Sequence, residues 1–254
     1  MKLGKIFNAL APVIAVAMAT GAAGCDGMNI SINGEDGKKL SELDMSGAPP
    51  EELVLLGPDT VEVTAGDKLA ISVDGDPEAA ERVRFTLKDG TLGILRKDKD
   101  WSGGNKVAMV HVTMPAPKEV TMAGSGKITA AALAPKAKVT IAGSGLIETP
   151  GLAGESLDLT IAGSGSYRAA GNIGSLDMTV AGSGSAEADA LRVDKAKISI
   201  AGSGNASFMS DGEVDASIMG SGSVKVKGRA KCTVSAMGSG KLYCETAPEA
   251  KDAE

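Results

Sequence analysis

Cysteine is the residue type whose spacing points most directly to chemistry in this chain, which has three cysteines among 254 residues. Cys25 follows a basic start at Lys2 and Lys5, an apolar run over residues 10–19 and a string of small residues. This order is typical of an export signal, which is too short to span a membrane as a mature helix. Residues 1–24 are therefore predicted to be a signal peptide that takes the protein out of the cytoplasm.

The residues directly before Cys25 predict what happens to its thiol after export. Ala22-Ala23-Gly24-Cys25 is similar to the bacterial lipoprotein box, in which a lipid is attached to the cysteine. We predict lipidation of Cys25 and attachment to a membrane through that lipid. The alternative is ordinary signal-peptidase cleavage near Ala19 or Ala23, which would leave a periplasmic or secreted protein.

Cys232 and Cys244 are the remaining pair, and an exported protein folds where disulfides persist. The repeat described below places both beside the same corner, about one strand spacing apart. We predict that they form a disulfide that closes the last turn of the fold. The alternative is two small buried thiols that pack as apolar side chains.

The titratable residues form no catalytic constellation. His111 is the only histidine, and no second histidine, cysteine pair or carboxylate cluster lies near it in the sequence, which predicts a structural role. Glu148, Arg168 and Glu187 recur at one position of successive repeats and predict a ladder of alternating charge on a solvated face. A polysaccharide-cleaving enzyme is the alternative, and it would need carboxylates that converge in one groove. No catalytic residue, metal ion or cofactor is expected.

Gly-Ser-Gly recurs seven times at a spacing of 18 to 20 residues, and this repeat must organise the elements that carry these residues. Self-similarity at such a period is typical of a solenoid. A phosphate loop is excluded, because neither a completed dinucleotide fingerprint nor Gly-Lys-Ser/Thr follows. We predict structural corners in which one or both glycines adopt a positive φ. The corner glycines are Gly124, Gly126, Gly143, Gly145, Gly163, Gly165, Gly182, Gly184, Gly202, Gly204, Gly220, Gly222, Gly238 and Gly240.

Apolar residues alternate on both sides of every corner. After the corner, the second and fourth residues are mostly apolar or small, as in Ile128 and Ala130. Before the corner, the second, fourth and sixth residues are apolar, as in Ile141, Val139 and Ala137. Period two with one apolar face predicts half-buried strands. The fold class is therefore all-β, a parallel β-helix or β-solenoid with coils of about 19 residues, whose segments of variable length form loose loops.

Composition divides the chain after the signal into four parts. Residues 25–53 are rich in Gly, Ser, Asp and Glu and predict a flexible tether. Irregular strands follow over residues 54–120, with a charged loop that holds Trp101, and regular coils follow over residues 121–245. Residues 54–245 together are predicted to form the solenoid domain, and residues 246–254 a polar tail.

Several of these segments resemble one known family. The strands over residues 60–73, the Asp89-Gly90-Thr91-Leu92 turn, the strand over residues 107–114 with Pro115, and the repeated corners are similar to the GIN-domain family of bacterial exported proteins. The resemblance covers about residues 50–245. Members are described as head domains of autotransporter adhesins, so the resemblance implies adhesion, and it carries over no binding residues.

The formal net charge of −6 disfavours nucleic acid as a partner. We predict a non-enzymatic binding or adhesion protein of the cell envelope of a Gram-negative bacterium, a periplasm-facing or surface lipoprotein whose ligand the sequence does not name. A structural envelope scaffold is a further alternative. Met219 and Met237 replace Ala before the last two corners and predict an apolar patch that suits either self-association through the C-terminal end or capping of the last coil.

Overall fold

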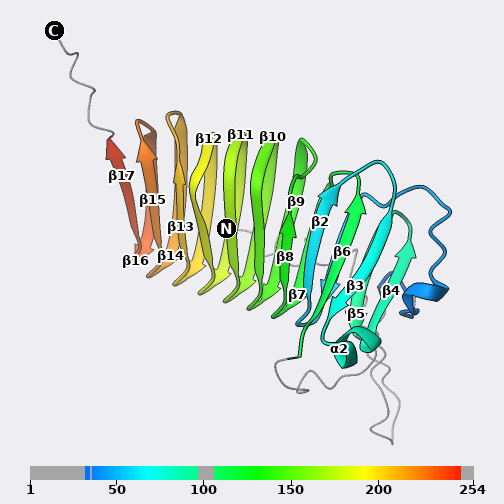
Figure 1. The fold of residues 1–254 in the computed structure, drawn as a ribbon. Helices are drawn as coiled ribbons and strands as arrows, with labels where there is room; N and C mark the ends of the chain where they lie inside the picture. Colours follow the sequence, from blue (N-terminus) through cyan, green and yellow to red (C-terminus); the bar gives the residue numbers. More distant parts are fainter. Residues whose placement is uncertain (1–31, 35, 97–105, 247–254) are drawn as a thin grey trace, which may run out of the picture.

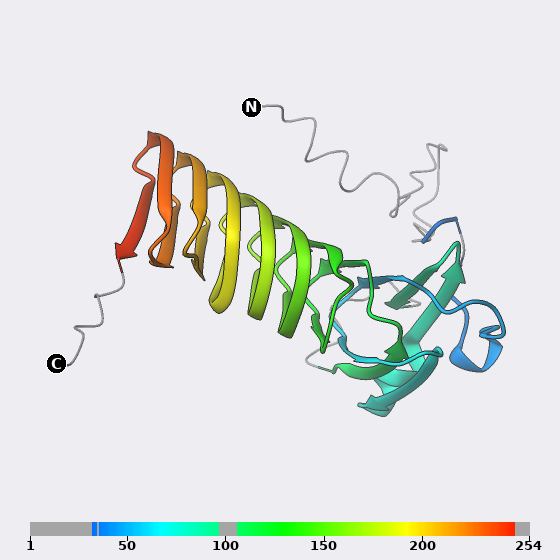
Figure 2. The same cartoon turned by 90° about the horizontal axis from the view of Figure 1, so that it is seen from above.

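The computed structural model describes residues 32–34, 36–96 and 106–246, which form a parallel β-solenoid (Figure 1). Seen from above, the coils follow one another along a single axis toward the C-terminal strands (Figure 2). Strands β1 to β17 join into one 17-stranded sheet that winds round the core. The predicted all-β solenoid is confirmed.

Each regular coil has two walls that meet at a Gly-Ser-Gly corner. The first wall holds the strands that end at a corner: β7 (Glu119–Gly124), β9 (Lys136–Gly143), the second parts of β10 (Leu146–Gly163), β11 (Ser166–Gly182) and β12 (Ser185–Gly202), β14 (Glu213–Gly220) and β16 (Lys231–Gly238). The second wall holds the strands that begin after a corner: β8 (Lys127–Ala130), the first parts of β10, β11 and β12, β13 (Asn205–Met209), β15 (Ser223–Gly228) and β17 (Lys241–Thr246). Alternate side chains of both walls point into the core between them.

Neighbouring coils stack without an offset in register on the first wall. Gly143 pairs with Gly163, Gly163 with Gly182, and Gly182 with Gly202, and the match continues through the last two corners. The inward residue two positions before each corner is therefore covered by its equivalent in the next coil. Ile161 illustrates the result, since none of its surface is exposed.

The two glycines of each corner serve different purposes. The first glycine always has a positive φ, from 108° at Gly238 to 132° at Gly124, a region that L side chains rarely adopt. The second glycine has no positive φ, but its neighbours leave no room for a side chain. A Cβ on Gly165 would lie 2.5 Å from Cγ2 of Ile141 and 2.9 Å from the carbonyl oxygen of Gly145. Backbone conformation thus explains one glycine, and close packing explains the other.

The segments between the middle coils are more regular than the predicted loose loops. Strands β10, β11 and β12 run on from the second wall into the first wall of the next coil, with register shifts after Thr149, Arg168 and Ala188. These shifts absorb the differences in coil length as β-bulges. Leu152 and Ile173 lie in these segments and are buried, so the segments form a short third wall.

The first coils are threaded out of sequence order. β1 (Glu52–Leu56) lies between β5 (Thr91–Arg96) and β7, and β2 (Thr60–Ala65) lies between β6 (Ala108–Met114) and β8, always in parallel. The coil made by β1 and β2 is therefore an inner coil, although it comes first in the chain. The coil made by β5 and β6 lies outside it.

Antiparallel strands and a helix close the N-terminal end of the solenoid. β3 (Ala70–Gly75) pairs with β6, and β4 (Val83–Lys88) pairs with β5. Helix α2 (Pro77–Arg82) contacts β3 and begins after Asp76, whose carboxylate accepts hydrogen bonds from the backbone N–H groups of Glu78 and Ala79. We call β3, β4, α2 and the described residues before β1 the N-terminal cap.

The segment predicted as a flexible tether belongs to this cap from Ile32 onward. Ile32 is 1% exposed and packs with Val54, Leu56 and Leu95. The backbone of Lys38 exchanges two hydrogen bonds of 2.8 Å with that of Phe85, and the 3-10 helix η1 (Leu40–Glu42) follows. The tether over residues 25–53 is therefore wrong for its described part, because Ile32, an apolar residue in a polar segment, docks on β1 and β5. The first strand also begins at Glu52 instead of residue 54.

Candidate functional site

A groove of about 550 Å³ runs along the first wall over β9, β10, β11, β12 and β14. Two rows of outward side chains border it, five and seven residues before the first glycine of each corner. The first row is Lys138, Asp158, Asp177, Lys197 and Asp215, and the second is Lys136, Ser156, Ser175, Lys195 and Glu213. We call this the lysine-aspartate groove. Lys118 extends it toward the N-terminal cap.

The register of the first wall builds both rows. Asp158 pairs with Lys138 on one side and with Asp177 on the other, and Lys197 and Asp215 follow in the same register. Because the parallel strands lie about 4.8 Å apart, residues that are about 19 positions apart in sequence become neighbours in a line. The groove is therefore aligned with the solenoid axis and presents one charged or polar group per row and coil.

Small and apolar residues form the floor between the two rows. Leu157 and Leu176 are each 2% exposed, and Ala137 and Ala196 are 8% and 4% exposed. The alanines, together with the serines of the second row, leave space between the long lysine side chains. The groove is thus a shallow strip with polar borders and a small apolar floor.

The borders of the groove carry both signs of charge. Five lysines and four carboxylates line it, and Lys118, Lys136 and Lys138 also pair with carboxylates beside the groove. At the N-terminal end, Nζ of Lys138 lies 2.9 Å from Oε1 of Glu119, and Nζ of Lys136 lies 3.1 Å from Oε2 of Glu155. Such a surface can bind anionic and hydroxyl groups that are spaced along an extended ligand.

Asp158 and Asp177 are carboxylates on neighbouring strands that lie next to each other in one row of this groove. Paired carboxylates are the machinery of glycoside hydrolysis, but Lys138 and Lys197 flank the pair in the same row. Among the residues that the structure describes, no group of three His, Cys, Asp or Glu side chains could hold a metal ion. The groove therefore offers charged groups for binding, with no metal centre among its described residues.

The second wall carries a separate ladder of charges. Nε of Arg168 lies 2.9 Å from Oε2 of Glu187, its Nη1 lies 3.4 Å from Oε1 of Glu148, and Nζ of Lys127 lies 2.7 Å from Oε2 of Glu148. The hydrogen bond from Lys127 holds the pKa of Glu148 below its usual value, and the bond to Glu187 raises the pKa of Arg168. The predicted alternating ladder is confirmed, and its charges are satisfied within it.

His111 lies on β6 between two carboxylates. Its Nδ1 is 3.2 Å from Oε2 of Glu62 on β2, and its Nε2 is 3.5 Å from Oδ2 of Asp74 on β3. The side chain is 40% exposed and lies outside the groove. This position links three strands on the outer surface of the solenoid, as a structural role requires.

A second cavity of about 700 Å³ lies in the N-terminal cap between η1 and α2. Arg84 lines it, and its Nη1 donates hydrogen bonds of 2.7 and 2.8 Å to the carbonyl oxygens of Glu81 and Val83. This guanidinium is thus held by the backbone of the cap. The cavity has no row of recurring groups like that of the lysine-aspartate groove.

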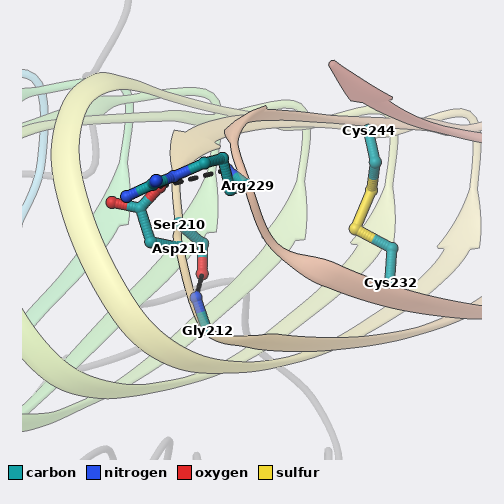
Figure 3. Close-up of a disulfide and its surroundings, with 6 residues drawn as sticks. All are labelled: Ser210, Asp211, Gly212, Arg229, Cys232 and Cys244. Carbon is teal, nitrogen blue, oxygen red and sulfur yellow. Dashed lines mark hydrogen bonds and ion pairs between the residues drawn. A yellow bond between two sulfur atoms is a disulfide. The ribbon is translucent and has the colours of Figure 1, made fainter. Parts of the chain in front are cut away.

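The structure places the predicted site residues that it describes in two different regions. Cys232 and Cys244 lie in the last coil and are joined by a disulfide, with Sγ atoms 1.90 Å apart and Cα atoms 6.7 Å apart (Figure 3). The corner glycines form one line along the solenoid. Cys25 and Trp101 lie outside the described residues, so lipidation of Cys25 stays a prediction.

Sequence reasoning identified neither row of the groove as a site. The first row has a regular signal in the sequence, since Lys138, Asp158, Asp177, Lys197 and Asp215 all lie five residues before a corner. The second row, with Lys136, Lys195 and Glu213, has an equally regular signal, since these residues lie seven positions before a corner. What the sequence does not reveal is the hollow between the rows.

The comparisons with known proteins concern the whole domain. The family model described as "Putative auto-transporter adhesin, head GIN domain" matches residues 49–230. No functionally curated protein matches this chain. Within the described ranges, no helix is both long and apolar enough to cross a membrane.

Several solved structures share the fold. A structure described as a "putative adhesin" from Bacteroides fragilis NCTC 9343 has a TM-score of 0.66 and 18% identity, over 78% of this chain and 93% of that chain. A "Putative lipid binding protein" from Parabacteroides distasonis ATCC 8503 has a TM-score of 0.60 and 24% identity, over 78% and 94%. A "putative adhesin" from Parabacteroides merdae ATCC 43184 has a TM-score of 0.59 and 20% identity, over 78% and 92%. At these identities the likeness shows the fold alone.

Proposed function

The chain belongs to the head GIN-domain family, and on this premise we propose that it is a non-enzymatic binding protein of the bacterial cell envelope, anchored by a lipid on Cys25. Its binding surface is the lysine-aspartate groove. Its ligand is an extended acidic polymer, such as an acidic polysaccharide of the envelope or of a neighbouring surface. The groove is the observation that carries this proposal.

The position of Ile32 supports an anchored arrangement. Ile32 is buried in the N-terminal cap and is seven residues after Cys25. A fully extended chain reaches about 3.5 Å per residue, so these residues span at most about 25 Å. A lipid on Cys25 would hold the cap close to the membrane surface. The solenoid, with the groove along its axis, would then extend from the membrane into the surrounding space.

The composition of the groove supports an acidic, hydrated polymer as the ligand. Five lysines line a strip that crosses five successive strands, so the ligand has to be extended. The chain is poor in aromatic residues, at 2%, which disfavours binding of sugars by stacking on aromatic rings. Lysine ammonium groups and the serines of the second row can bind carboxylate or sulfate groups and hydroxyls instead.

A polysaccharide-cleaving enzyme is the second candidate, because Asp158 and Asp177 are adjacent in the groove. Hydrolysis needs one carboxylic acid that stays protonated and a second group that acts as a nucleophile or base. Lys138 and Lys197 flank this pair in the same row, so the groove presents alternating groups of both charges, which suits binding of a charged polymer. Incubation of the protein with the bound polymer decides between these candidates. Release of reducing ends that stops in Asp158→Asn and Asp177→Asn would support the enzyme.

The binding proposal is tested with fluorescent alginate, an acidic polysaccharide, and with neutral dextran of the same size. We expect alginate alone to bind, and we expect Lys138→Ala combined with Lys197→Ala to weaken its binding about tenfold. Lys225→Ala combined with Lys227→Ala, on the second wall, is the matched control and should leave binding unchanged. Equal binding of alginate by the two double variants would rule out the groove as its site.

The anchoring proposal has a separate test in the native host. Metabolic labelling with a palmitate analogue should modify the wild-type chain, and Cys25→Ser should abolish the label and release the protein from the membrane fraction. A wild-type chain that carries no lipid would make it a soluble exported protein. The binding proposal would still stand in that case, because alginate binding is measured on the soluble domain.

A further inference from the structure

The two ends of the solenoid are closed to different extents. At the N-terminal end, β3, β4 and α2 cover the first coils. At the C-terminal end, β16 pairs with β14 and β17 pairs with β15, and no other pairing of these two strands occurs within the described residues. The far edges of β16 and β17 therefore present backbone N–H and C=O groups, which template the addition of further strands.

Apolar side chains are exposed on the coil that ends in these edges. Val234 and Tyr243 are each 49% exposed, and Met237 is 70% exposed. Val234 is the inward residue of the three, and its equivalent in the preceding coil, Ala216, is 3% exposed, whereas Met237 and Tyr243 are at outward positions. The last coil thus has the side-chain pattern of an inner coil but no neighbour on one side. It also lies beyond the segment that the family model matches, which ends at residue 230.

The last coil is held as one rigid unit. The disulfide between Cys232 on β16 and Cys244 on β17 joins the two edge strands across the coil (Figure 3). Before β16, the carboxylate of Asp211 accepts a hydrogen bond of 3.0 Å from the backbone N–H of Arg229 and pairs with Arg192 of an earlier coil. Both edges are therefore fixed relative to each other before any partner arrives, which lowers the entropy cost of association.

The outward residues of β17 are complementary to themselves in antiparallel register. They are Lys241, Tyr243 and Glu245, and Tyr243 is at the centre. If two copies of β17 pair about Tyr243, Lys241 of each copy faces Glu245 of the other, and the two tyrosine rings meet. Opposite charges and aromatic side chains are the cross-strand pairs that stabilise a sheet.

We propose that the C-terminal end is a self-association surface through which two copies of this chain join end to end, with β17 of one copy antiparallel to β17 of the other. The resulting two-fold contact is isologous and therefore closed. It continues the sheets of both solenoids through the shared interface. The contact area is limited, because each copy contributes only β16, of eight residues, and β17, of six residues. The dimer is therefore weak, and the fraction of the protein that dimerises depends on its concentration.

A head-to-tail filament is the competing arrangement. A filament would need the edges of β16 and β17 to pair with the N-terminal end of the next copy. That end carries the antiparallel strands β3 and β4, which α2 and the bridge between Lys38 and Phe85 cover in part. The far edge of β3 has no strand partner within the described residues either, so the size of the assembly decides: a closed dimer supports the proposal, and a series of growing oligomers overturns it.

Sedimentation velocity of residues 26–254, which contain the whole described fold, tests the proposal over a hundredfold range of concentration. We expect wild-type protein to dimerise, and Lys241→Glu and Glu245→Lys each to weaken the dimer about tenfold, because each variant opposes like charges. An equimolar mixture of these two variants should dimerise again, because every facing pair then has opposite charges. If one variant is uniformly labelled with nitrogen-15, native mass spectrometry distinguishes this heterodimer from either homodimer by mass.

Glu245 also pairs with Lys225 within one chain at 2.8 Å, so Lys225→Ser is the control for loss of that ion pair, and it should dimerise like the wild type. A wild-type chain that stays monomeric at all concentrations would overturn the proposal. So would variants that dimerise like the wild type, or a mixture that does not recover. A chain that dimerises only when residues 247–254 are removed would show that this tail covers the end, and would overturn the proposal for the full chain.

Discussion

The guanidinium of Arg96 holds the carboxylate of Asp59 in the interior of the protein, across 37 residues of sequence. Nε of Arg96 lies 2.8 Å from Oδ2, and Nη2 lies 2.5 Å from Oδ1. The backbone N–H of Ala108 also donates to Oδ1 at 2.9 Å, and Nη2 of Arg96 also donates to the carbonyl oxygen of Lys106. Asp59 lies between β1 and β2, while Arg96 ends β5 and Ala108 begins β6, so this cluster joins the two coils that are threaded out of order.

Asp59→Asn is expected to destabilise the fold by about 3 to 5 kcal/mol, because it leaves the buried guanidinium without a counter-charge. The side chains of Arg96 and Asp59 are 5% and 1% exposed, and their hydrogen bond raises the pKa of Arg96. Urea denaturation measures the change. Glu78→Gln, which removes the exposed pair with Lys106, is the control and should cost less than about 1 kcal/mol. Equal midpoints for the two variants would show that the buried pair contributes nothing.

Gly163→Val is expected to destabilise the fold by a few kcal/mol, on the order of other substitutions that strain the backbone. Gly163 has a φ of 120°, and a Cβ at this position would lie 2.6 Å from the carbonyl oxygen of Gly143. Ser164→Val, at the adjacent exposed position, is the matched control and should change stability little. Thermal unfolding followed by circular dichroism compares the two variants. An unchanged melting temperature in Gly163→Val would contradict the positive-φ account of the corners.

Removal of the disulfide by Cys232→Ser and Cys244→Ser together is expected to destabilise the last coil by about 3 kcal/mol in the loop-entropy model. Neighbouring coils contribute separately in a solenoid, so the loss should stay local. Trypsin should then cut at Lys231 and Lys241 much sooner than in the wild type, while β10 to β12 remain intact. In the unfolded, unreduced wild type, neither Cys232 nor Cys244 should react with a thiol reagent. Reaction of both would show that the bond is absent.

Tyr167 is expected to titrate at a higher pH than a solvent-exposed tyrosine. Burial raises the pKa of Tyr167 to about 12, although its hydrogen bond of 2.7 Å with the Thr149 hydroxyl opposes this shift. In Tyr243→Phe, which leaves Tyr167 as the last tyrosine, ultraviolet absorbance should show tyrosinate only near pH 12 as long as the fold persists. A titration midpoint near the ordinary tyrosine pKa of about 10 in the folded variant would contradict this burial.

The same shift predicts a loss of stability in alkali. The pKa of Tyr167 is higher in the folded state than in the unfolded state, where it is about 10. The stabilising contribution of the neutral Tyr167 to the free energy of unfolding is therefore fully present below pH 10 and is lost as the pH rises toward about 12. The melting temperature of the wild type should therefore fall more steeply above about pH 10 than that of Tyr167→Phe. Parallel curves for the two proteins would contradict the linkage.

Much of the regular solenoid could be predicted because its physics is local and repeated. Alternating apolar residues define strands, and Gly-Ser-Gly marks each reversal, so Ile141, Ile161 and Val180 could be assigned to one buried line from their positions relative to the corners. The pair Cys232 and Cys244 followed from the same count of positions. The docking of Ile32 was missed, because one apolar residue in a polar segment has no periodicity that would reveal its partners.

The sequence by itself determined the strand period, the corners and the order of charges along each row, since each depends on residues that are close in the chain and recur every 18 to 20 positions. Only the tertiary structure decided how β1 and β2 come to lie inside the coil of β5 and β6, how Asp59 meets Arg96, and where the first wall is hollowed into a groove. These features depend on contacts between segments of unrelated sequence, whose free energy comes from burial and pairing in three dimensions and leaves no period in the chain.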